Sequence, residues 1–199
     1  MRWQQQTDAH TYRDNVAGGG IFVALYNGDG PSVARKAERY MYARFAAHQQ
    51  HTPVFTAFTK SYAETAKFLE KEGAHTTATT ALIRGKEIHF ANVGDSHMLV
   101  CGKTSFRRLT TARWIKSGAV MRPAVGKYEL DPDNDRWLIL STKALFNTLD
   151  DRVIAHLCRN QTENEIVVER IFKQIRRKNP SLEREISIII LQLSSYLSL

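Results

Sequence analysis

Apolar residues along this chain follow two periods, one typical of strands and the other of helices. The apolar run at residues 20–26 ends in Asn-Gly, which predicts a buried strand that enters a tight turn. A helix is predicted over residues 31–48, where apolar positions recur at helical spacing, namely Ala34, Ala37, Met41 and Phe45. The stripe of a second predicted helix comprises Phe58, Tyr62, Ala66 and Leu69, with Gly73 as its stop.

The middle of the chain predicts a hairpin followed by irregular structure. Gly85-Lys86 separates two strand-like segments, residues 76–84 and 87–93, which is the spacing of a two-residue hairpin turn. A third short strand follows. The pattern then weakens over residues 103–136, where Gly, Pro and an Asp-Pro-Asp-Asn-Asp run favour a loop.

The C-terminal third predicts further mixed structure: a strand at residues 137–140, helices at 150–158 and 162–178, and a closing strand at 186–193. Thr162 and Glu165 have the spacing of a capping box at the start of the second helix. Strands and helices in this order are typical of an α+β fold. Because no repeat or linker divides the chain, we expect a single domain over residues 1–199.

The composition narrows the class of protein. The chain has 199 residues, 43% of them hydrophobic and 24% charged, which is enough to bury a core. No apolar run approaches the roughly 20 residues that span a bilayer, and the first residues lack the apolar core of a secretory signal. Cys101 and Cys158 are far apart in sequence, so they indicate neither a disulfide framework nor a thiolate metal site. We expect an intracellular protein of the cytoplasm or nucleus, without membrane association.

The net charge of +8 and the pI of about 9.6 would permit binding to nucleic acids. The basic residues are spread along the chain, however, and no nucleic-acid motif accompanies them. The one cluster, residues 176–178, lies where it would complement the dipole at the end of a predicted helix. We therefore do not expect a nucleic-acid partner.

Three segments carry motifs of a known family: Phe22–Gly30 (FVALYNGDG), Thr77–Gly85 (TATTALIRG) with Ala91–Ser96 (ANVGDS), and Arg136–Asn147 (RWLILSTKALFN). In this order they resemble protein phosphatase 2C, a family of metal-dependent Ser/Thr phosphatases. That family reads F-x-V-x-D-G-H-G-G, then G-S-T-A with A-N-x-G-D-S-R, then D-x-F-L-I-L-A-S-D-G-L-W-D. The resemblance covers about Trp3 to Leu193. It implies a β-sandwich of two antiparallel sheets flanked by helix pairs, with metals at one sheet edge.

The resemblance also implies two divalent metals held by carboxylates, which activate a water against a phosphoester. The first half of the chain alters most of the corresponding positions. The family's early Glu-Asp pair reads Thr7-Asp8, and the arginine that grips phosphate falls on Trp3, beside Arg2. At the second motif the metal-bridging Asp is replaced by Asn27, the ligand Gly is kept as Gly28, and the general-acid His is replaced by Asp29.

The second half of the chain replaces acids with cations. The metal-ligating Asp of the family's S-D-G is Lys143, and its closing D-N-I-T begins at Arg184, followed by Glu185. The acid linked to a third metal falls on Ala112. Because ammonium and guanidinium groups repel dications and are costly to bury alone, we expect Lys143 and Arg184 to pair with Asp8 or Asp29. The intact Gly94-Asp95-Ser96 is expected to have a structural role at a turn.

The stretch from Trp114 to Arg136 is short compared with that of active family members, which place a flap there. Met121 and Tyr128 belong to an apolar segment of this stretch without helical or strand period. We expect this segment, with the groove beside Asn27 and Asp29, to contact a partner. The alternative is that these side chains close a shortened core.

These replacements predict a pseudophosphatase: a catalytically inactive, PPM-type domain without cofactor. It would act as a scaffold or regulator in phosphorylation signalling, with a protein kinase or an active phosphatase as its partner. The alternative function is a weakly active phosphatase that binds Mn²⁺ or Mg²⁺ through Asp8, Asp29 and Glu185. A third interpretation is a folded product that has lost any role.

Overall fold

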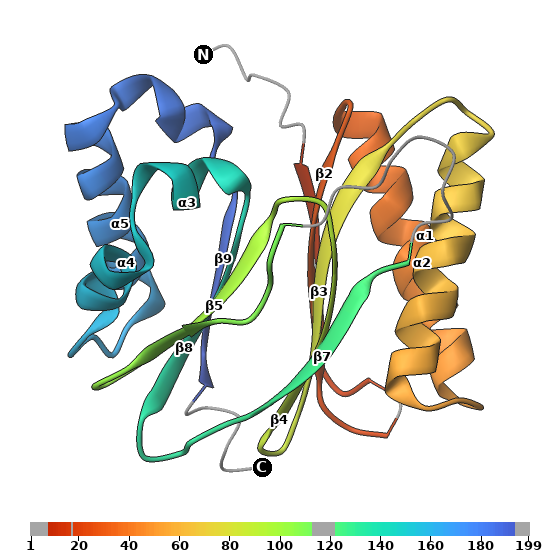
Figure 1. The fold of residues 1–199 in the computed structure, drawn as a ribbon, viewed down its shortest axis with the longest axis horizontal. Helices are drawn as coiled ribbons and strands as arrows, with labels where there is room; N and C mark the ends of the chain where they lie inside the picture. The colour runs from red at the N-terminus through yellow and green to blue at the C-terminus, as the bar shows by residue number, and fades with distance from the viewer. Residues whose placement is uncertain (1–7, 17, 113–121, 194–199) are drawn as a thin grey trace. The chain divides into compact units, whose positions relative to one another are not determined.

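The computed structural model describes residues 8–16, 18–112 and 122–193. The chain has an α+β fold with two antiparallel sheets, as predicted (Figure 1). It forms two compact units, unit 1 with residues 1–96 and 112–128, and unit 2 with residues 97–111 and 129–199. The single domain over residues 1–199 stays a prediction, and each unit is described by itself.

Unit 1 is a five-stranded sheet with two long helices on one face. The strands run in the order β1-β2-β3-β4-β7 and comprise β1 (Asp8–Arg13), β2 (Ile21–Gly28), β3 (Thr76–Arg84), β4 (Glu87–Val93) and β7 (Ala124–Glu129). The helices are α1 (Pro31–Gln49) and α2 (Val54–Glu70). Both the hairpin and the helix pair agree with the sequence prediction, and β3 and β4 have the predicted bounds.

The core of unit 1 lies between β2 and the two helices. The ring of Phe22 lies tilted against that of Phe45 of α1, with 4.8 Å between centroids, and Phe45 in turn stacks on Phe58 of α2 at 4.7 Å. The predicted stripe of α1 is buried at all four positions. In α2, Thr65 is buried where Ala66 was expected, because its hydroxyl donates a hydrogen bond to the carbonyl of Ser61 within the helix.

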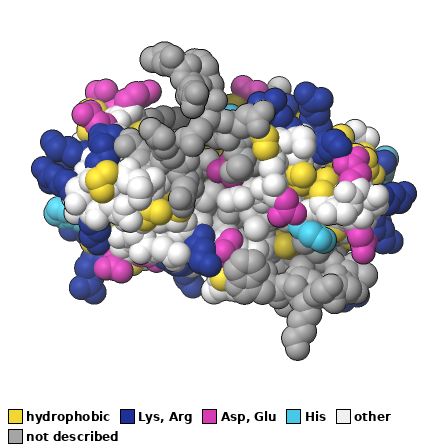
Figure 2. All heavy atoms as spheres, turned by 90° about the horizontal axis from the view of Figure 1, so that it is seen from above, with side chains coloured by type: hydrophobic (Ala, Val, Ile, Leu, Met, Phe, Trp, Pro, Cys, Tyr) yellow, Lys and Arg dark blue, Asp and Glu magenta, His cyan; other side chains and the backbone are white. Residues whose placement is uncertain are grey.

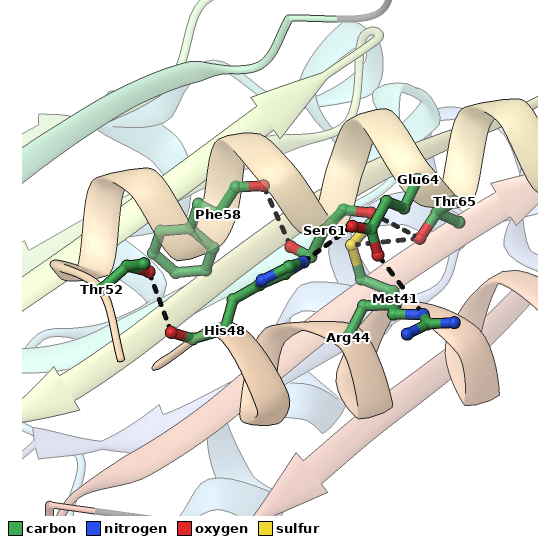
Figure 3. A network of polar contacts seen from close by, with 8 residues as sticks. All are labelled: Met41, Arg44, His48, Thr52, Phe58, Ser61, Glu64 and Thr65. Carbon is green, nitrogen blue, oxygen red and sulfur yellow. Dashed lines mark hydrogen bonds and ion pairs between the residues drawn. The ribbon is translucent and has the colours of Figure 1, made fainter. Parts of the chain in front are cut away.

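Side chains of α1 contact side chains of α2 at intervals of four residues. Lys36 pairs with Glu72 at 2.5 Å, and Tyr40 stacks on Phe68 at 4.4 Å. Figure 3 shows the next contacts, in which Glu64 of α2 forms an ion pair with Arg44 of α1 at 3.3 Å and a hydrogen bond with His48 of α1 at 2.9 Å. This register fixes how α1 and α2 lie along one another.

Unit 2 is a four-stranded sheet covered by three helices. Its strands run in the order β6-β5-β8-β9 and comprise β5 (His97–Gly102), β6 (Phe106–Arg108), β8 (Asp135–Ser141) and β9 (Ile188–Gln192). The helices are α3 (Lys143–Thr148), α4 (Asp151–Cys158) and α5 (Asn164–Lys178), with a 3-10 turn η1 (Pro180–Glu185) before β9. Leu99, Trp137 and Ile139 of the sheet pack against Ile154 and Ile171 of the helices.

Three local predictions were wrong. The stretch predicted as a loop contains two short strands, β6 and β7. Their sequences lack the apolar pattern of a strand, and they form because they pair with the neighbouring strands β5 and β4. Helix α3 was not predicted. The capping box also fails, because α5 begins at Asn164 with Glu163 as N-cap, so Thr162 lies outside the helix.

No helix in the described part of the chain is both long and apolar enough to cross a membrane.

Candidate functional site

Asp8 and Asn27 lie opposite one another at the same end of β1 and β2. Side chains of directly opposed residues share one face of the sheet, with Cβ atoms about 5 Å apart. Tyr26, which precedes Asn27 in β2, is buried against α1 and α2. Because successive side chains of a strand point to opposite faces, Asp8 and Asn27 lie on the face away from these helices. The carboxyl of Asp8 and the amide of Asn27 are therefore neighbours, as the motif alignment requires.

The turn between β2 and α1 needs a glycine at residue 28 for a steric reason. A Cβ atom there would lie 2.9 Å from the backbone nitrogen of Ala34 and 3.2 Å from Cβ of Val33. The start of α1 therefore packs directly on this backbone. Retention of Gly28 is explained by this close approach, without reference to a metal.

Asp29 is engaged with the backbone before β3. Its carboxylate accepts a hydrogen bond from the N–H of His75 at 3.0 Å, and its own N–H donates to the carbonyl of His75 at 3.2 Å. Thr76 then donates its hydroxyl hydrogen to the carbonyl of Asn27 at 3.0 Å. These three bonds join the β2–α1 turn to the segment that leads into β3, so Asp29 has a structural role.

The motif at Gly94 to Ser96 also forms a packed turn of unit 1. Gly94 has φ of 97°, a conformation that favours glycine, and a Cβ atom there would clash with Thr77. The hydroxyl of Ser96 is 3.3 Å from that of Thr77, and Thr79 donates to the side-chain oxygen of Asn92 at 2.5 Å. These contacts give Gly94 and Ser96 a structural role, and the role expected for Asp95 stays a prediction.

In unit 2, the end of β8 meets the segment that precedes β9. The N–H of Thr142 donates to the carbonyl of Ser187 at 3.1 Å, and the N–H of Ser187 donates to the hydroxyl of Thr142 at 3.3 Å. The positions matching the family's S-D-G and D-N-I-T are therefore adjacent. Lys143 is the first residue of α3 and is exposed, and its expected pairing with Asp8 or Asp29 stays a prediction.

The remaining residues that were predicted for the site do not all lie in the described part of the chain. Arg184 and Glu185 belong to η1, close in sequence to Ser187. Ala112 is exposed. Thr7 and Met121 lie outside the described residues. Tyr128 is half-buried on β7, where half-buried and exposed residues alternate, so the loop expected for this segment is wrong.

Among residues 8–16, 18–112 and 122–193, no three His, Cys, Asp or Glu side chains are grouped so as to hold a metal ion. The pair that unit 1 brings together is one carboxylate and one amide, Asp8 and Asn27. Hard dications select several carboxylate oxygens. This pair therefore offers a single charged ligand.

A charged cluster in unit 2 was not predicted from the sequence. Arg108 of β6 donates from Nε to Asp151 at 2.8 Å, and a second guanidinium nitrogen also contacts that carboxylate. The guanidinium lies over the ring of Phe146 at 4.7 Å, and His97 meets the same ring edge-on at 5.3 Å. The cluster joins β6 to α3 and to the start of α4. In the sequence, Arg108 and Asp151 each look like an ordinary surface residue, so their pairing could not be predicted.

Basic and acidic side chains share the face of the molecule that Figure 2 draws, where Lys and Arg are interspersed with Asp and Glu. The last turn of α5 carries Arg176, Arg177 and Lys178, and the amine of Lys178 donates to the carbonyl of Thr148 at 3.1 Å. That lysine therefore has a local structural partner.

A family model of protein phosphatase 2C matches residues 4–117. The S. agalactiae serine/threonine phosphatase has a TM-score of 0.77 at 15% identity, covering 96% of this chain and 94% of that one. The serine/threonine phosphatase Stp1 from Staphylococcus aureus has a TM-score of 0.71 at 15% sequence identity, and the match covers 95% of this chain and 89% of that one.

A C. elegans sex determining protein gives a TM-score of 0.74 at 13% identity, covering 96% of this chain and 62% of that one. At these identities the structural likeness concerns the fold alone. No protein of curated function matches the sequence.

Proposed function

The chain belongs to the protein phosphatase 2C family, and we propose that this member has lost phosphatase activity and works by binding a protein partner. Its role would be that of a scaffold or regulator in phosphorylation signalling. The candidate partners are a protein kinase or an active phosphatase. The proposal rests on the chemistry of the altered metal positions.

The observation that carries the proposal is Asn27 opposite Asp8 at the end of β2. Two dications about 4 Å apart repel one another about four times as strongly as two unit charges at that distance. A bridging carboxylate offsets this repulsion, whereas a neutral amide does not. With Asn27 at the bridging position, a two-metal centre lacks its central negative charge.

Two further features support the loss of chemistry. Lys143 and Arg184 bring positive charge to positions at which the family has acids. The carboxylate of Asp29 is already bonded to the backbone of His75, which leaves it less available to a cation. The rival assignment, a weak Mn²⁺ or Mg²⁺ site formed by Asp8, Asp29 and Glu185, would therefore have to break a structural contact.

Phosphopeptide hydrolysis by the full chain, with and without Mn²⁺, tests the loss of activity. We expect release of phosphate to equal that of a buffer blank. The double variant Asn27→Asp with Lys143→Asp should remain inactive, because Arg184 and Asp29 are unchanged. Turnover that rises with Mn²⁺ and disappears in Asp8→Ala would overturn the proposal and establish the enzyme.

For the partner we propose the edge strand β7 as the contact surface. In the described part of unit 1 it is the last strand of the sheet, and Val125 is 40% exposed. Strand edges bind extended segments through backbone hydrogen bonds, and exposed apolar side chains add affinity. The partner would contribute such a segment.

Affinity capture with the intact chain, with bound proteins identified by mass spectrometry, tests this surface. Val125→Lys and Tyr128→Ser should abolish capture of a kinase or phosphatase while the melting curve is unchanged. Phe106→Ser is the matched control, because Phe106 is also 40% exposed but lies on β6. Capture that survives both β7 variants would place the interface elsewhere, and unfolding would assign Tyr128 to the core.

A further inference from the structure

The exposed side of α5 carries a row of cations that we call the basic stripe. Its members are exposed and recur at three- and four-residue spacing, and they are Ile166, Arg170, Lys173 and Arg177. Residues at these spacings lie along one side of a helix. The opposite requirement, burial, is met by Val167, Ile171 and Ile175, which pack in the core of unit 2. The basic stripe is therefore not needed to hold α5 on its sheet.

The cations of the basic stripe are not neutralised within the described part of the chain. Arg170, Lys173 and Arg177 form no ion pair or side-chain hydrogen bond with any described residue. They lie within about 10 Å along the helix axis, at 1.5 Å per residue. Like charges at three- and four-residue spacing destabilise a helix. An anionic group placed along the stripe would relieve a repulsion that folding leaves in place.

Helix α4 adds positive charge to the same helix layer. It packs on α5 through the apolar cluster that contains Ile154 and Ile171 (Figure 1). Arg152 is exposed on α4, whereas the one acid of this helix, Asp151, is paired with Arg108 of β6. The acid of α4 is thus engaged and its exposed arginine is not, which extends the positive surface beyond α5.

The surroundings of the stripe favour an acidic protein segment over a nucleic acid. Glu165 and Glu169 lie on the adjoining side of α5 and would repel a phosphate backbone, which is charged along its whole length. Neither α4 nor α5, both fully described, has an exposed Phe, Tyr or Trp ring on which a base could stack. Ile166, which is 36% exposed, offers an apolar contact that a protein side chain can meet.

We propose that the basic stripe of α5 binds an acidic segment of a protein partner. Carboxylates of that segment pair with the three cations, and an apolar side chain packs on Ile166. This inference rests on the proposed function and deepens it, because it gives the chemistry of a second contact with the partner. Exposed ion pairs are individually weak and are screened by salt, so the stripe chiefly speeds and orients docking.

Fluorescence anisotropy tests the stripe, with a labelled synthetic peptide of Glu, Asp and Leu titrated with the full chain. We expect binding that weakens as salt rises from about 50 mM to about 300 mM, because screening shortens the reach of surface charges. Arg170→Glu with Lys173→Glu should weaken binding by about tenfold, since two attractive contacts become repulsive. Arg35→Glu with Arg39→Glu is the matched control on α1, because these exposed arginines give the same change of charge. Its affinity should be nearly that of the natural chain.

Arg170→Gln with Lys173→Gln keeps the test decisive if the charge-reversed chain unfolds, because glutamine removes both charges and is favourable in a helix. A peptide with Gln and Asn in place of Glu and Asp should not bind. Equal affinity of the natural chain and a folded α5 variant would overturn the proposal, as would an equal loss in the α1 control. Tighter binding of a single-stranded oligonucleotide than of the acidic peptide would also overturn it.

This assay separates the stripe from the proposed function itself. It contains no kinase or phosphatase, and it does not involve β7, which belongs to unit 1. A negative result would therefore remove the acidic contact and leave the loss of activity and the β7 surface standing. Phosphate release or unchanged capture by the β7 variants would count against the proposed function and leave the peptide result as measured.

Discussion

The carboxylate of Asp29 accepts the N–H of His75 at 3.0 Å, while the carbonyl of His75 accepts the N–H of Asp29 at 3.2 Å. This reciprocal pair joins two segments that lie 46 residues apart. Asp29 stands where the family has its general acid, but its contacts here are structural. We call its two hydrogen bonds with His75 a clasp, because they join the β2–α1 turn to the segment before β3.

Removal of the Asp29 side chain should therefore affect stability. Asp29→Ala should lower the free energy of unfolding by about 1 kcal/mol, because one charge-assisted hydrogen bond at an exposed site is lost. Asp29→Asn keeps an acceptor and should cost less. His75→Ala should be nearly neutral, because only its backbone takes part. Urea denaturation measures all three, and equal stability of the Ala variant and the natural chain would contradict the clasp.

Calorimetric titration with Mn²⁺ should detect no pair of tight sites in the full chain. Asn27 supplies no negative charge at the bridging position, and Lys143 is a cation where the family has a ligand. Asp8→Ala is the control, and its titration should match that of the natural chain. Two saturable sites that disappear in Asp8→Ala would show that the metal centre survives.

Local signals account for the parts of the fold that the sequence predicted well. The β3–β4 hairpin was predicted to the residue because Gly85, with φ of 49°, provides the turn that its position requires. Strand β7 was missed because its support is not local. Gly126 lies so close to the ring of Phe90 on β4 that a Cβ atom there would clash, and no pattern within residues 124–129 announces that partner.

The contacts of the candidate site could not be predicted from local sequence patterns either. The pairing of β1 with β2 places Asn27 opposite Asp8, and the sequence pattern had not predicted a strand at β1. The clasp between Asp29 and His75 joins distant segments through tertiary packing. A single sequence records residue types at such positions but not their partners.

The ion pair between Arg108 and Asp151 should be sensitive to the shape of the cation. Two guanidinium nitrogens contact the carboxylate, and the guanidinium plane also covers Phe146. A lysine ammonium is a point charge and provides neither the fork nor the stacking. Arg108→Lys should therefore cost about 1 kcal/mol, because the pair is partly exposed.

Arg107→Lys is the matched control for this substitution, since the adjacent side chain is exposed and the charge is kept. Urea denaturation of both variants separates the two cases. Equal stability of the two variants would mean that charge alone accounts for the Arg108 contact.

His89 of β4 should make unit 1 less stable in acid. Its ring lies 5.5 Å from that of Phe55, and its Nε2 lies 3.4 Å from Glu87, which also pairs with Lys127. Burial lowers the pKa of His89; Glu87 opposes this shift, and the charges of Lys127 and Arg84 add to it. The unfolded chain therefore binds a proton more readily than the folded chain below the usual histidine pKa of about 6.5.

It follows that the stabilising contribution of neutral His89 is fully present above about pH 6.5 and is lost as the pH falls through the lower pKa of the folded state. Melting temperatures at about pH 8 and pH 5 should differ more in the natural chain than in His89→Gln, which cannot take up the proton. The acid limit of about pH 5 lies above the usual pKa of glutamate, so Glu87 contributes little to the comparison. Parallel melting profiles for the two chains would show that His89 titrates equally in the folded and unfolded states.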